Sequence, residues 1–323
     1  MMKSSRNSSN KETGLLMESA IEAIGLTKKY GELLAVDHVN FQVQKGEIFG
    51  FLGPNGAGKT TTIRMLTTLT KPTEGTAKIF GYDVQRQPLL AKERMGIVPE
   101  ISNVYDELSA WDNVLFTAEL YHVGKRDAEK RAEELLEVFD LQEKKRSKAK
   151  SFSKGMRRRL AIAMGLTNKP DLLFLDEPTS GLDVQSALII KEVVRDLNRQ
   201  GSTVFLTTHN IEEANILCDR VAIIHKGRIA AINTPERLKR TIQSVQSVEV
   251  ALDSTSPDVG EELERIGGVN EVRKEGDKYR LYTNDPSTVL LNLWDYVKAK
   301  GLKPITVNTL GPSLEDVFVK LTK

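Results

Sequence analysis

The stretch Gly53-Pro54-Asn55-Gly56-Ala57-Gly58-Lys59-Thr60-Thr61 decides the fold of this 323-residue chain. It reads G-x-x-x-x-G-K-T, the spacing of a phosphate-binding loop. An apolar run at 47–52 predicts a buried strand before it, and 59–69 has helical spacing, which weakens the alternative of an ordinary glycine-rich turn. Glycines let backbone N–H groups turn toward one anion, and a helix N-terminus adds positive potential. We therefore expect all nine residues to cradle a phosphate, with Lys59 on the β- and γ-phosphates and the Thr60 hydroxyl on Mg²⁺.

The composition is that of a soluble globular protein with about two domains. The chain is 40% hydrophobic and 28% charged, with a net charge of +2 that gives no argument for a nucleic-acid partner. A single cysteine, Cys218, excludes an internal disulfide and suits a protein of a reducing compartment. We interpret Cys218 as a small buried apolar residue. No segment has the roughly 18 consecutive apolar residues of a membrane helix. The polar start, 1–19, predicts a disordered tail, so we expect a cytoplasmic protein whose membrane role would come through a partner.

The order of the predicted elements divides the rest of the chain in two. Strands and helices alternate over 20–240, which predicts an α/β core with a β-rich N-terminal part, and a helical subdomain is inserted at about 100–168. Over 241–323 the order is βαββαβ, which predicts a small α+β domain of ferredoxin-like type. This second unit has 10 Lys and Arg against 13 Asp and Glu, which argues against a nucleic-acid surface there.

Acidic residues follow a second apolar strand at 172–175. The sequence Asp176-Glu177 after this strand is the Walker B pattern, which places Asp176 near Mg²⁺ and lets Glu177 orient and deprotonate an attacking water. The alternative is that these acids form only an exposed turn, and the presence of a phosphate loop in the same chain argues against it. His209 follows another apolar strand, 203–208; such a histidine is often only a structural hydrogen-bonding group. After the two preceding motifs we expect it to contact the γ-phosphate and Glu177.

In combination, the motifs are similar to those of ABC-type ATPases. Phe152-Ser153-Lys154-Gly155-Met156 resembles the signature motif L-S-G-G-Q, and the phosphate loop, Leu175–Thr179, Ser180–Asp183 and Thr207–His209 match the family in the family's order. The segment 312–318 resembles the C-terminal domain of ABC-2-type exporter ATPase subunits, of which daunorubicin-resistance and sodium-efflux proteins are examples. The resemblance implies a P-loop NTPase core and ATP as the nucleotide.

The same resemblance implies how the site is assembled and used. Ser153 and Gly155 would bind the γ-phosphate of ATP held by a second copy, so two chains would form a homodimer with two composite sites. Asp183 would communicate across that interface, and Tyr30 would stack on adenine, although an ordinary strand-end tyrosine is the alternative. ATP-dependent dimer closure and hydrolysis would drive a separate transmembrane permease, with the protein peripheral on the cytoplasmic face of the cell membrane. A soluble ABC ATPase in translation or DNA repair is the alternative function.

Two departures from the family pattern concern the site. Lys154 and Met156 replace the usual Gly and Gln of the signature, while the two phosphate contacts are retained. Glu100 stands where the family has a glutamine, and a carboxylate binds divalent metal more strongly, so we expect Glu100 to join Thr60 and Asp176 as an Mg²⁺ ligand. Basic residues at 144–150 and 157–159 flank the signature. We interpret them as a solvated surface, with a membrane-headgroup or partner contact as the alternative.

Overall fold

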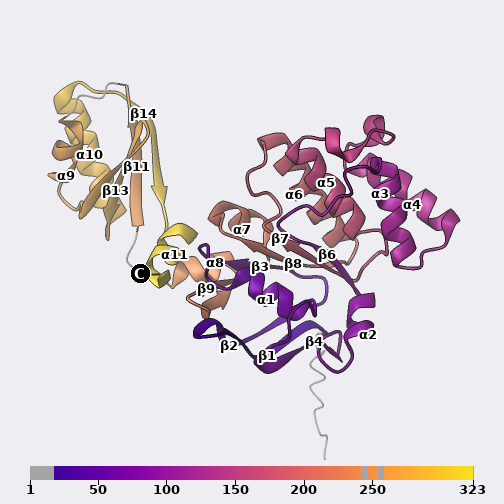
Figure 1. Ribbon diagram of the computed structural model, residues 1–323. Coiled ribbons are helices and arrows are strands. Elements are labelled where there is room, and N and C mark those ends of the chain that lie inside the picture. The colour runs from indigo at the N-terminus through magenta and orange to yellow at the C-terminus, as the bar shows by residue number, and fades with distance from the viewer. Residues whose placement is uncertain (1–17, 242–245, 254–257, 323) are drawn as a thin grey trace, which may run out of the picture.

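The computed structural model describes residues 18–241, 246–253 and 258–322 (Figure 1). The predicted disordered tail lies outside this range except for Glu18 and Ser19, where the first strand begins. The strands form three sheets, a four-stranded sheet, a six-stranded sheet and a second four-stranded sheet near the C-terminus.

The six-stranded sheet is the centre of the first part of the chain. Its order is β10-β9-β3-β8-β7-β6, and all neighbours from β9 to β6 pair in parallel, whereas β10 is antiparallel to β9. The bounds are β3 Ile48–Leu52, β6 Met95–Val98, β7 Leu172–Asp176, β8 Thr203–Thr208, β9 Arg220–His225 and β10 Arg228–Asn233.

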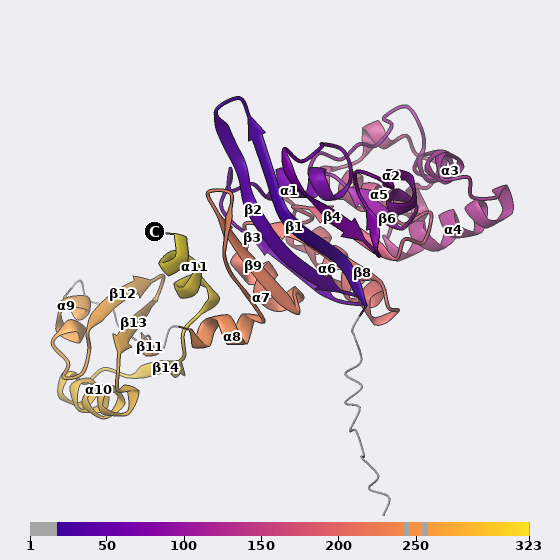
Figure 2. The same cartoon turned by 90° about the horizontal axis from the view of Figure 1, so that it is seen from below.

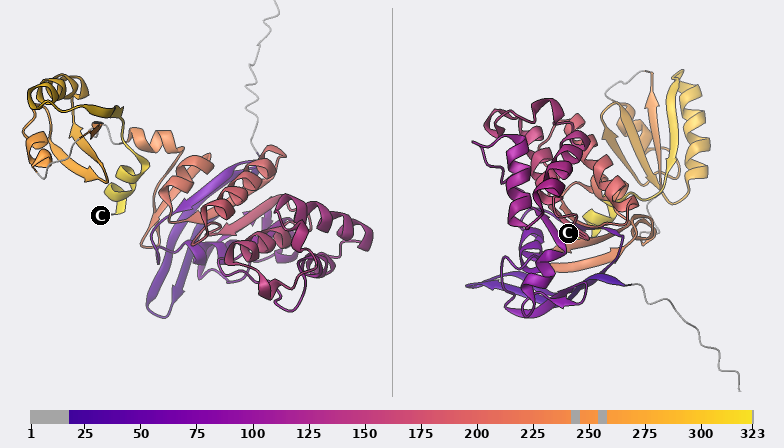
Figure 3. Two further views of the ribbon diagram at one scale, coloured as in Figure 1. Left: turned by 90° about the horizontal axis from the view of Figure 1, so that it is seen from above. Right: turned by 90° about the vertical axis from the view of Figure 1, so that its right-hand side faces the viewer.

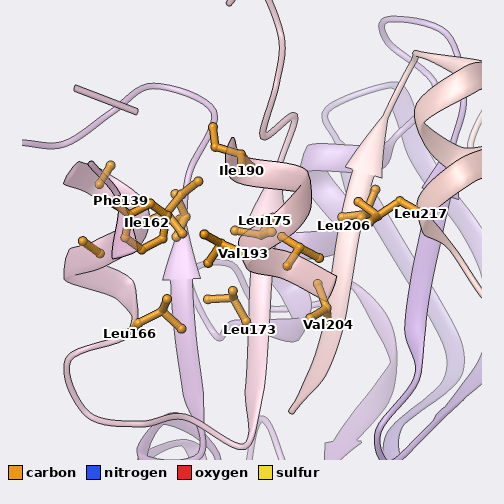
Figure 4. Packing of buried hydrophobic residues seen from close by; sticks show 14 of the residues in the cluster. Phe139, Ile162, Leu166, Leu173, Leu175, Ile190, Val193, Val204, Leu206 and Leu217 are labelled. Atoms are coloured by element: carbon orange, nitrogen blue, oxygen red, sulfur yellow. The ribbon is translucent and has the colours of Figure 1, made fainter. Parts of the chain in front are cut away.

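Both faces of this sheet are covered, which explains why its strands are continuous apolar runs. In β3, Ile48 and Leu52 belong to one buried cluster and Phe49 and Phe51 to another. Figure 4 shows the first cluster, where Leu173 and Leu175 of β7 and Val204 and Leu206 of β8 meet Ile162, Ile190 and Val193 from helices. The sheet is therefore the middle layer, and its strand ends meet the loops that carry the motifs.

The helices over the first cluster come from the second half of the core. They are α3 Ala110–Leu120, α4 Lys125–Val138, α5 Lys154–Gly165, α6 Val184–Arg199, α7 Ile211–Leu217 and α8 Pro235–Arg240. Helix α3 begins with a serine cap, because the Ser109 hydroxyl accepts from the Asp112 backbone N–H at 3.1 Å. Helix α6 begins with a second side-chain cap, because the Asp183 carboxylate accepts from the Ser186 backbone N–H.

The second cluster lies under the β-rich part (Figure 3). It is covered by a four-stranded antiparallel sheet in the order β2-β1-β4-β5 together with helix α1. The bounds are β1 Ser19–Tyr30, β2 Leu33–Gln44, β4 Glu74–Ile79, β5 Tyr82–Asp83, α1 Lys59–Leu66 and α2 Pro88–Glu93. Phe41, Phe49 and Phe205 pack with ring centroids 5.6–5.9 Å apart and join this sheet to the central one.

The C-terminal sheet has the order β12-β13-β11-β14 with all pairs antiparallel. Its elements follow the predicted βαββαβ order, with β11 Gln246–Leu252, α9 Val259–Glu264, β12 Glu271–Glu275, β13 Lys278–Thr283, α10 Pro286–Lys300 and β14 Pro304–Leu310. Val248, Leu281 and Leu293 belong to a third buried cluster that contains no residue of the first two.

The last helix, α11 Leu314–Thr322, does not pack with that third cluster. Leu314 and Val317 are buried in the first cluster, together with Leu238 of α8. Figures 1 and 2 show α11 and α8 side by side between the C-terminal sheet and the core. The sequence prediction grouped α11 with the C-terminal unit, whereas its buried face belongs to the packing of the core.

Candidate active site

The phosphate loop runs from the end of β3 to the first turn of α1, as its sequence predicts. Gly58 precedes the helix with φ 105°, a conformation that side chains disfavour. A Cβ atom there would also lie 2.6 Å from the carbonyl oxygen of Ala35. Only glycine at position 58 therefore allows the loop to approach β2 this closely.

The Lys59 side chain is buried and held by the loop itself. Its Nζ donates to the carbonyl oxygens of Gly53 at 2.8 Å and Pro54 at 3.2 Å. The same Nζ lies 3.1 Å from Oε1 of Glu177, and both side chains are less than a tenth exposed. The contact is an ion pair without hydrogen-bond alignment, since Oε1 has no hydrogen-bond partner among the described residues. The ammonium is thus oriented at the point where the phosphate loop meets the acidic strand end.

Asp176 ends β7 beside the phosphate loop. Its Oδ1 accepts from the Thr60 hydroxyl at 3.3 Å and from the Thr207 hydroxyl at 2.5 Å. Because β7 is parallel to β8, the ends of both strands reach the same edge of the sheet. The structure therefore brings together Thr60 and Asp176, two residues predicted to bind Mg²⁺.

Glu177 has a left-handed backbone, with φ 49°, in the loop that follows β7. Its N–H donates to the Thr207 carbonyl and lies 3.1 Å from the Thr207 hydroxyl, which holds this uncommon conformation. Its Oε2 lies 2.8 Å from Nδ1 of His209. One oxygen of the carboxylate thus faces Lys59 and the other His209, as expected for a residue at the reacting end of a phosphate site.

A cavity of about 640 Å³ is lined by Lys59, Thr60 and Glu177, whereas His209 lines a neighbouring cavity of about 350 Å³. Tyr30 lines the larger cavity at the end of β1, 44% exposed, with Nζ of Lys28 5.0 Å from the ring centroid. Glu100 lines the same cavity from the loop after β6. Most of the phosphate loop also lines this cavity, namely Asn55, Gly56, Gly58, Lys59, Thr60 and Thr61. The other three residues of the loop, Gly53, Pro54 and Ala57, are not among the lining residues.

The signature residues lie in a different place. Ser153 caps α5 by accepting from the Met156 N–H at 3.2 Å, and Asp183 caps α6 by accepting from the Ser186 N–H at 2.8 Å. Hydrogen bonds from the Ser186 N–H and hydroxyl lower the pKa of Asp183. Gly155 packs against this second cap, and none of Ser153, Gly155 and Asp183 lines the cavity of the same chain. Within one chain, the signature residues are therefore separate from the cavity beside the phosphate loop.

Comparisons with known proteins agree with this geometry. A family model described as "ABC transporter" matches residues 36–180. A daunorubicin-resistance ATP-binding protein of Streptomyces coeruleorubidus is 38% identical over 305 residues, which cover 94% of this chain and 95% of the relative. A Nod factor export ATP-binding protein I of Ralstonia nicotianae is 36% identical over 92% of each chain. The chain belongs to the ABC transporter family.

A solved structure supports the same assignment. It is a dimeric ATP-binding cassette in a post-hydrolysis state with ADP and Pi, 28% identical, with a TM-score of 0.62 over 66% of this chain and 98% of that one. The predicted fold class and family are confirmed. The chain is an ATPase subunit of the exporter type, and the alternative of a soluble translation or repair ATPase is not favoured.

The basic segment after the signature was wrongly interpreted as solvated in this ABC ATPase. Arg158 and Arg159 are 3% and 8% exposed, because both point from α5 into the molecule. Arg159 donates to the carbonyl of Phe139 at 2.8 Å, whereas Arg157 is partly exposed and pairs with Asp106. Helical spacing gave a signal for this, since Arg158 stands four residues before the buried Ile162.

Two further residues of the ABC site were missed by the sequence prediction. Thr207 joins Asp176 to the Glu177 backbone through one hydroxyl. Lys226 lines the cavity beside the phosphate loop, where the N–H of the next residue, Gly227, donates to the Ala57 carbonyl at 3.0 Å. Thr207 belongs to the motif Thr207–His209, from which the sequence analysis predicted a role for His209 alone. Lys226 follows β9 and has no motif of its own.

The donors present fit Mg²⁺. Thr60, Asp176 and Glu100 offer a hydroxyl and two carboxylates, which are hard oxygen ligands. Within residues 18–241, 246–253 and 258–322, no group of three or more His, Cys, Asp or Glu side chains could hold a metal by itself. That agrees with Mg²⁺, which commonly takes one or two carboxylates and completes its sphere with water and nucleotide phosphate.

Among the helices of the described residues, none has the length and apolar character needed to span a membrane.

Proposed function

We propose that this ABC ATPase works as a homodimer with two composite sites. The phosphate loop of one copy would hold ATP, and Ser153 and Gly155 of the other would close on its γ-phosphate. The separation of these two half-sites within one chain supports the proposal, as does the dimeric relative with ADP and Pi. Each charge-assisted hydrogen bond to phosphate contributes about 1.5–3 kcal/mol, so a few suffice to make closure depend on ATP.

Within each site, Glu177 is the proposed general base. The observation that carries this role is its position between Lys59 and His209, at 3.1 and 2.8 Å. A buried carboxylate at that point can accept a proton from a water aligned with the γ-phosphate, while Lys59 offsets negative charge on the phosphates. His209 would orient Glu177 through Nδ1, and its other ring nitrogen would contact the γ-phosphate once ATP is bound.

Mg²⁺ and the adenine would be held by residues on opposite sides of the cavity. Thr60, Asp176 and Glu100 would hold Mg²⁺, which supplies positive charge for the β- and γ-phosphates when bound. Tyr30, exposed at the far end of the cavity, would stack on the adenine. Stacking tolerates other bases, so some use of GTP is expected.

The partner for transport is a separate transmembrane permease, contacted from the cytoplasmic face of the membrane. Support comes from the loop after Glu100, where Ile101 is 83% exposed, and from α3, where Leu120 is 60% exposed. The rings of Tyr105, in the same loop, and Phe116, on α3, stack edge to face with their centroids 4.9 Å apart. This apolar strip fits a short amphipathic helix of the permease. The unit 241–323 is proposed as an accessory domain. The relatives named for daunorubicin resistance and for Nod factor export support a role in export.

The decisive experiment replaces Glu177 by glutamine, which keeps the size and removes the base. Phosphate release should fall by about 100-fold or more, while binding of a fluorescent ATP analogue is retained. Glu137→Gln, at an exposed position on α4, is the matched control and should retain full activity. Undiminished hydrolysis by Glu177→Gln would show that the catalytic assignment is wrong.

The same variant tests the dimer. With ATP and Mg²⁺ the hydrolysis-deficient protein should change from monomer to dimer by light scattering, and Ser153→Glu in the same background should remain monomeric because a carboxylate repels the incoming phosphate. A monomer under both conditions would contradict the composite site.

A further inference from the structure

The guanidinium of Arg158 is buried beside the active site and connects two of its loops. The four hydrogen bonds that it makes with described residues all go to backbone carbonyl oxygens. Nε donates to Pro178 at 3.1 Å, one terminal nitrogen donates to Asp176 at 2.5 Å, and the other donates to Glu100 at 3.2 Å and to Pro99.

These carbonyls belong to the segments that carry the chemistry. Asp176 and Pro178 stand on either side of Glu177, the proposed base, while Pro99 and Glu100 form the loop that brings the third metal-binding carboxylate to the cavity. A planar guanidinium has its donors in a fixed fork, so it can set the spacing of two loops in a way that a flexible ammonium cannot.

The surroundings keep this side chain charged and in place. Burial lowers the pKa of Arg158 to about 10, and the nearby carboxylates of Asp176, Glu100, Glu213 and Glu177 act in the opposite direction. The group is therefore protonated at neutral pH. Removing it would leave four carbonyls without their donor and four acidic groups without a shared positive charge.

Arg158 also lies on the helix that begins at the signature. Ser153 caps α5, and Arg158 projects from its second turn. The side chain thereby joins this helix to the backbone around Glu177 and to the Glu100 loop.

We propose that Arg158 is a positioning residue that fixes the Glu100 loop against the Glu177 segment and ties both to the signature helix. The proposal rests on the proposed roles of Glu177 and Glu100. It predicts that replacing the guanidinium alters the rate of hydrolysis and the Mg²⁺ dependence more than the affinity for ATP, because the hydrogen bonds of Arg158 among the described residues go to other segments than the phosphate loop.

The test compares Arg158→Lys with Arg159→Lys. Both arginines are buried neighbours on α5, but within the described part of the chain Arg159 donates hydrogen bonds only to Phe139 and Asp140, away from the two loops. For Arg158→Lys we expect kcat to fall by about 10-fold or more, in line with the sensitivity of catalysis to small displacements. The Mg²⁺ concentration at half-maximal rate should rise about 3-fold or more, with KM for ATP changed less than about 2-fold. Arg159→Lys should show a similar loss of Tm with kcat and Mg²⁺ dependence near wild type.

The result is decisive in each direction. Equal kcat and Mg²⁺ curves for the two variants, at equal folded fraction, would overturn the proposal and make Arg158 a structural residue. If Arg158→Lys does not fold, Arg158→Gln provides the same comparison, and unfolding of both while Arg159→Lys folds would equally overturn it. Failure of the proposed function is recognised separately, since it would appear as full activity in Glu177→Gln.

Discussion

At the residue scale, the site depends on carboxylates whose two oxygens have different partners. Glu177 faces Lys59 with one oxygen and His209 with the other, and Asp176 accepts from Thr60 and Thr207 on a single oxygen. Oδ2 of Asp176 accepts neither of these two hydrogen bonds and would be available to the proposed Mg²⁺. Glu100 differs from both, because it is exposed and only its backbone is held, by Arg158.

The exposed position of Glu100 gives a prediction on metal dependence. Glu100→Gln should retain ATP binding and raise the Mg²⁺ concentration at half-maximal rate by about 3-fold or more, because an amide oxygen carries no net charge for the metal. Mg²⁺ titrations of phosphate release measure this. Glu93→Gln, an exposed residue of α2, is the control, and superimposable titrations for all three proteins would contradict a metal-binding role of Glu100.

At the element scale, the signature sequence has a packing role besides its proposed binding role. A Cβ atom on Gly155 would lie 2.2 Å from Oγ of Ser186 and 3.0 Å from Oδ2 of Asp183. The first turn of α5 therefore approaches the N-terminus of α6 closely only because residue 155 has no side chain. Lys154, which replaces the usual glycine of the signature, also extends toward the segment before α6. A Cβ atom added to Gly181 would lie 2.4 Å from Nζ of Lys154.

Gly155→Ala should accordingly destabilise the protein as well as weaken the composite site. Overpacking of a tight contact costs about 1–3 kcal/mol. Urea unfolding followed by circular dichroism measures the loss, and Gly311→Ala, where no atom lies within 4 Å of the added Cβ, should leave the unfolding midpoint nearly unchanged. An unchanged midpoint for Gly155→Ala would show that the two helix ends move apart at little cost.

At the scale of the whole molecule, α11 ties the C-terminal unit to the ATPase core. Leu314 and Val317 enter the core cluster, and on the other side Arg280 of β13 donates to Asp316 at 3.4 Å and to the Ser247 hydroxyl at 3.0 Å. The end of the chain thus contacts both units, so a change in the core can reach the C-terminal sheet through this helix.

Leu314→Ala tests how far the core depends on α11. Leu314 is 2% exposed, and truncating a buried leucine costs about 2–5 kcal/mol. The free energy of unfolding of the core should fall by that amount in chemical denaturation. Val319→Ala is the control on the same helix, since Val319 is 42% exposed, and equal midpoints for both variants would show that α11 adds no stability to the core.

The sequence by itself determined the elements whose signals are local. The phosphate loop between strand and helix, the Ser109 cap, the bounds of α6 and the fully apolar strands β7 and β8 all follow from spacing and residue type within a few positions. Short or half-exposed elements were missed, such as α2 and β10, because six residues with mixed burial carry little periodicity.

Only the tertiary structure decided which residues far apart in the chain meet. The motifs indicated Glu177 and His209 one by one, but their distance of 2.8 Å depends on the parallel pairing of β7 with β8. The burial of Arg158 and the docking of α11 depend on carbonyls and side chains that other segments supply, from Glu100 to Leu238. Local sequence cannot predict such contacts, because a charged or amphipathic helix face is equally compatible with water until its neighbours are in place.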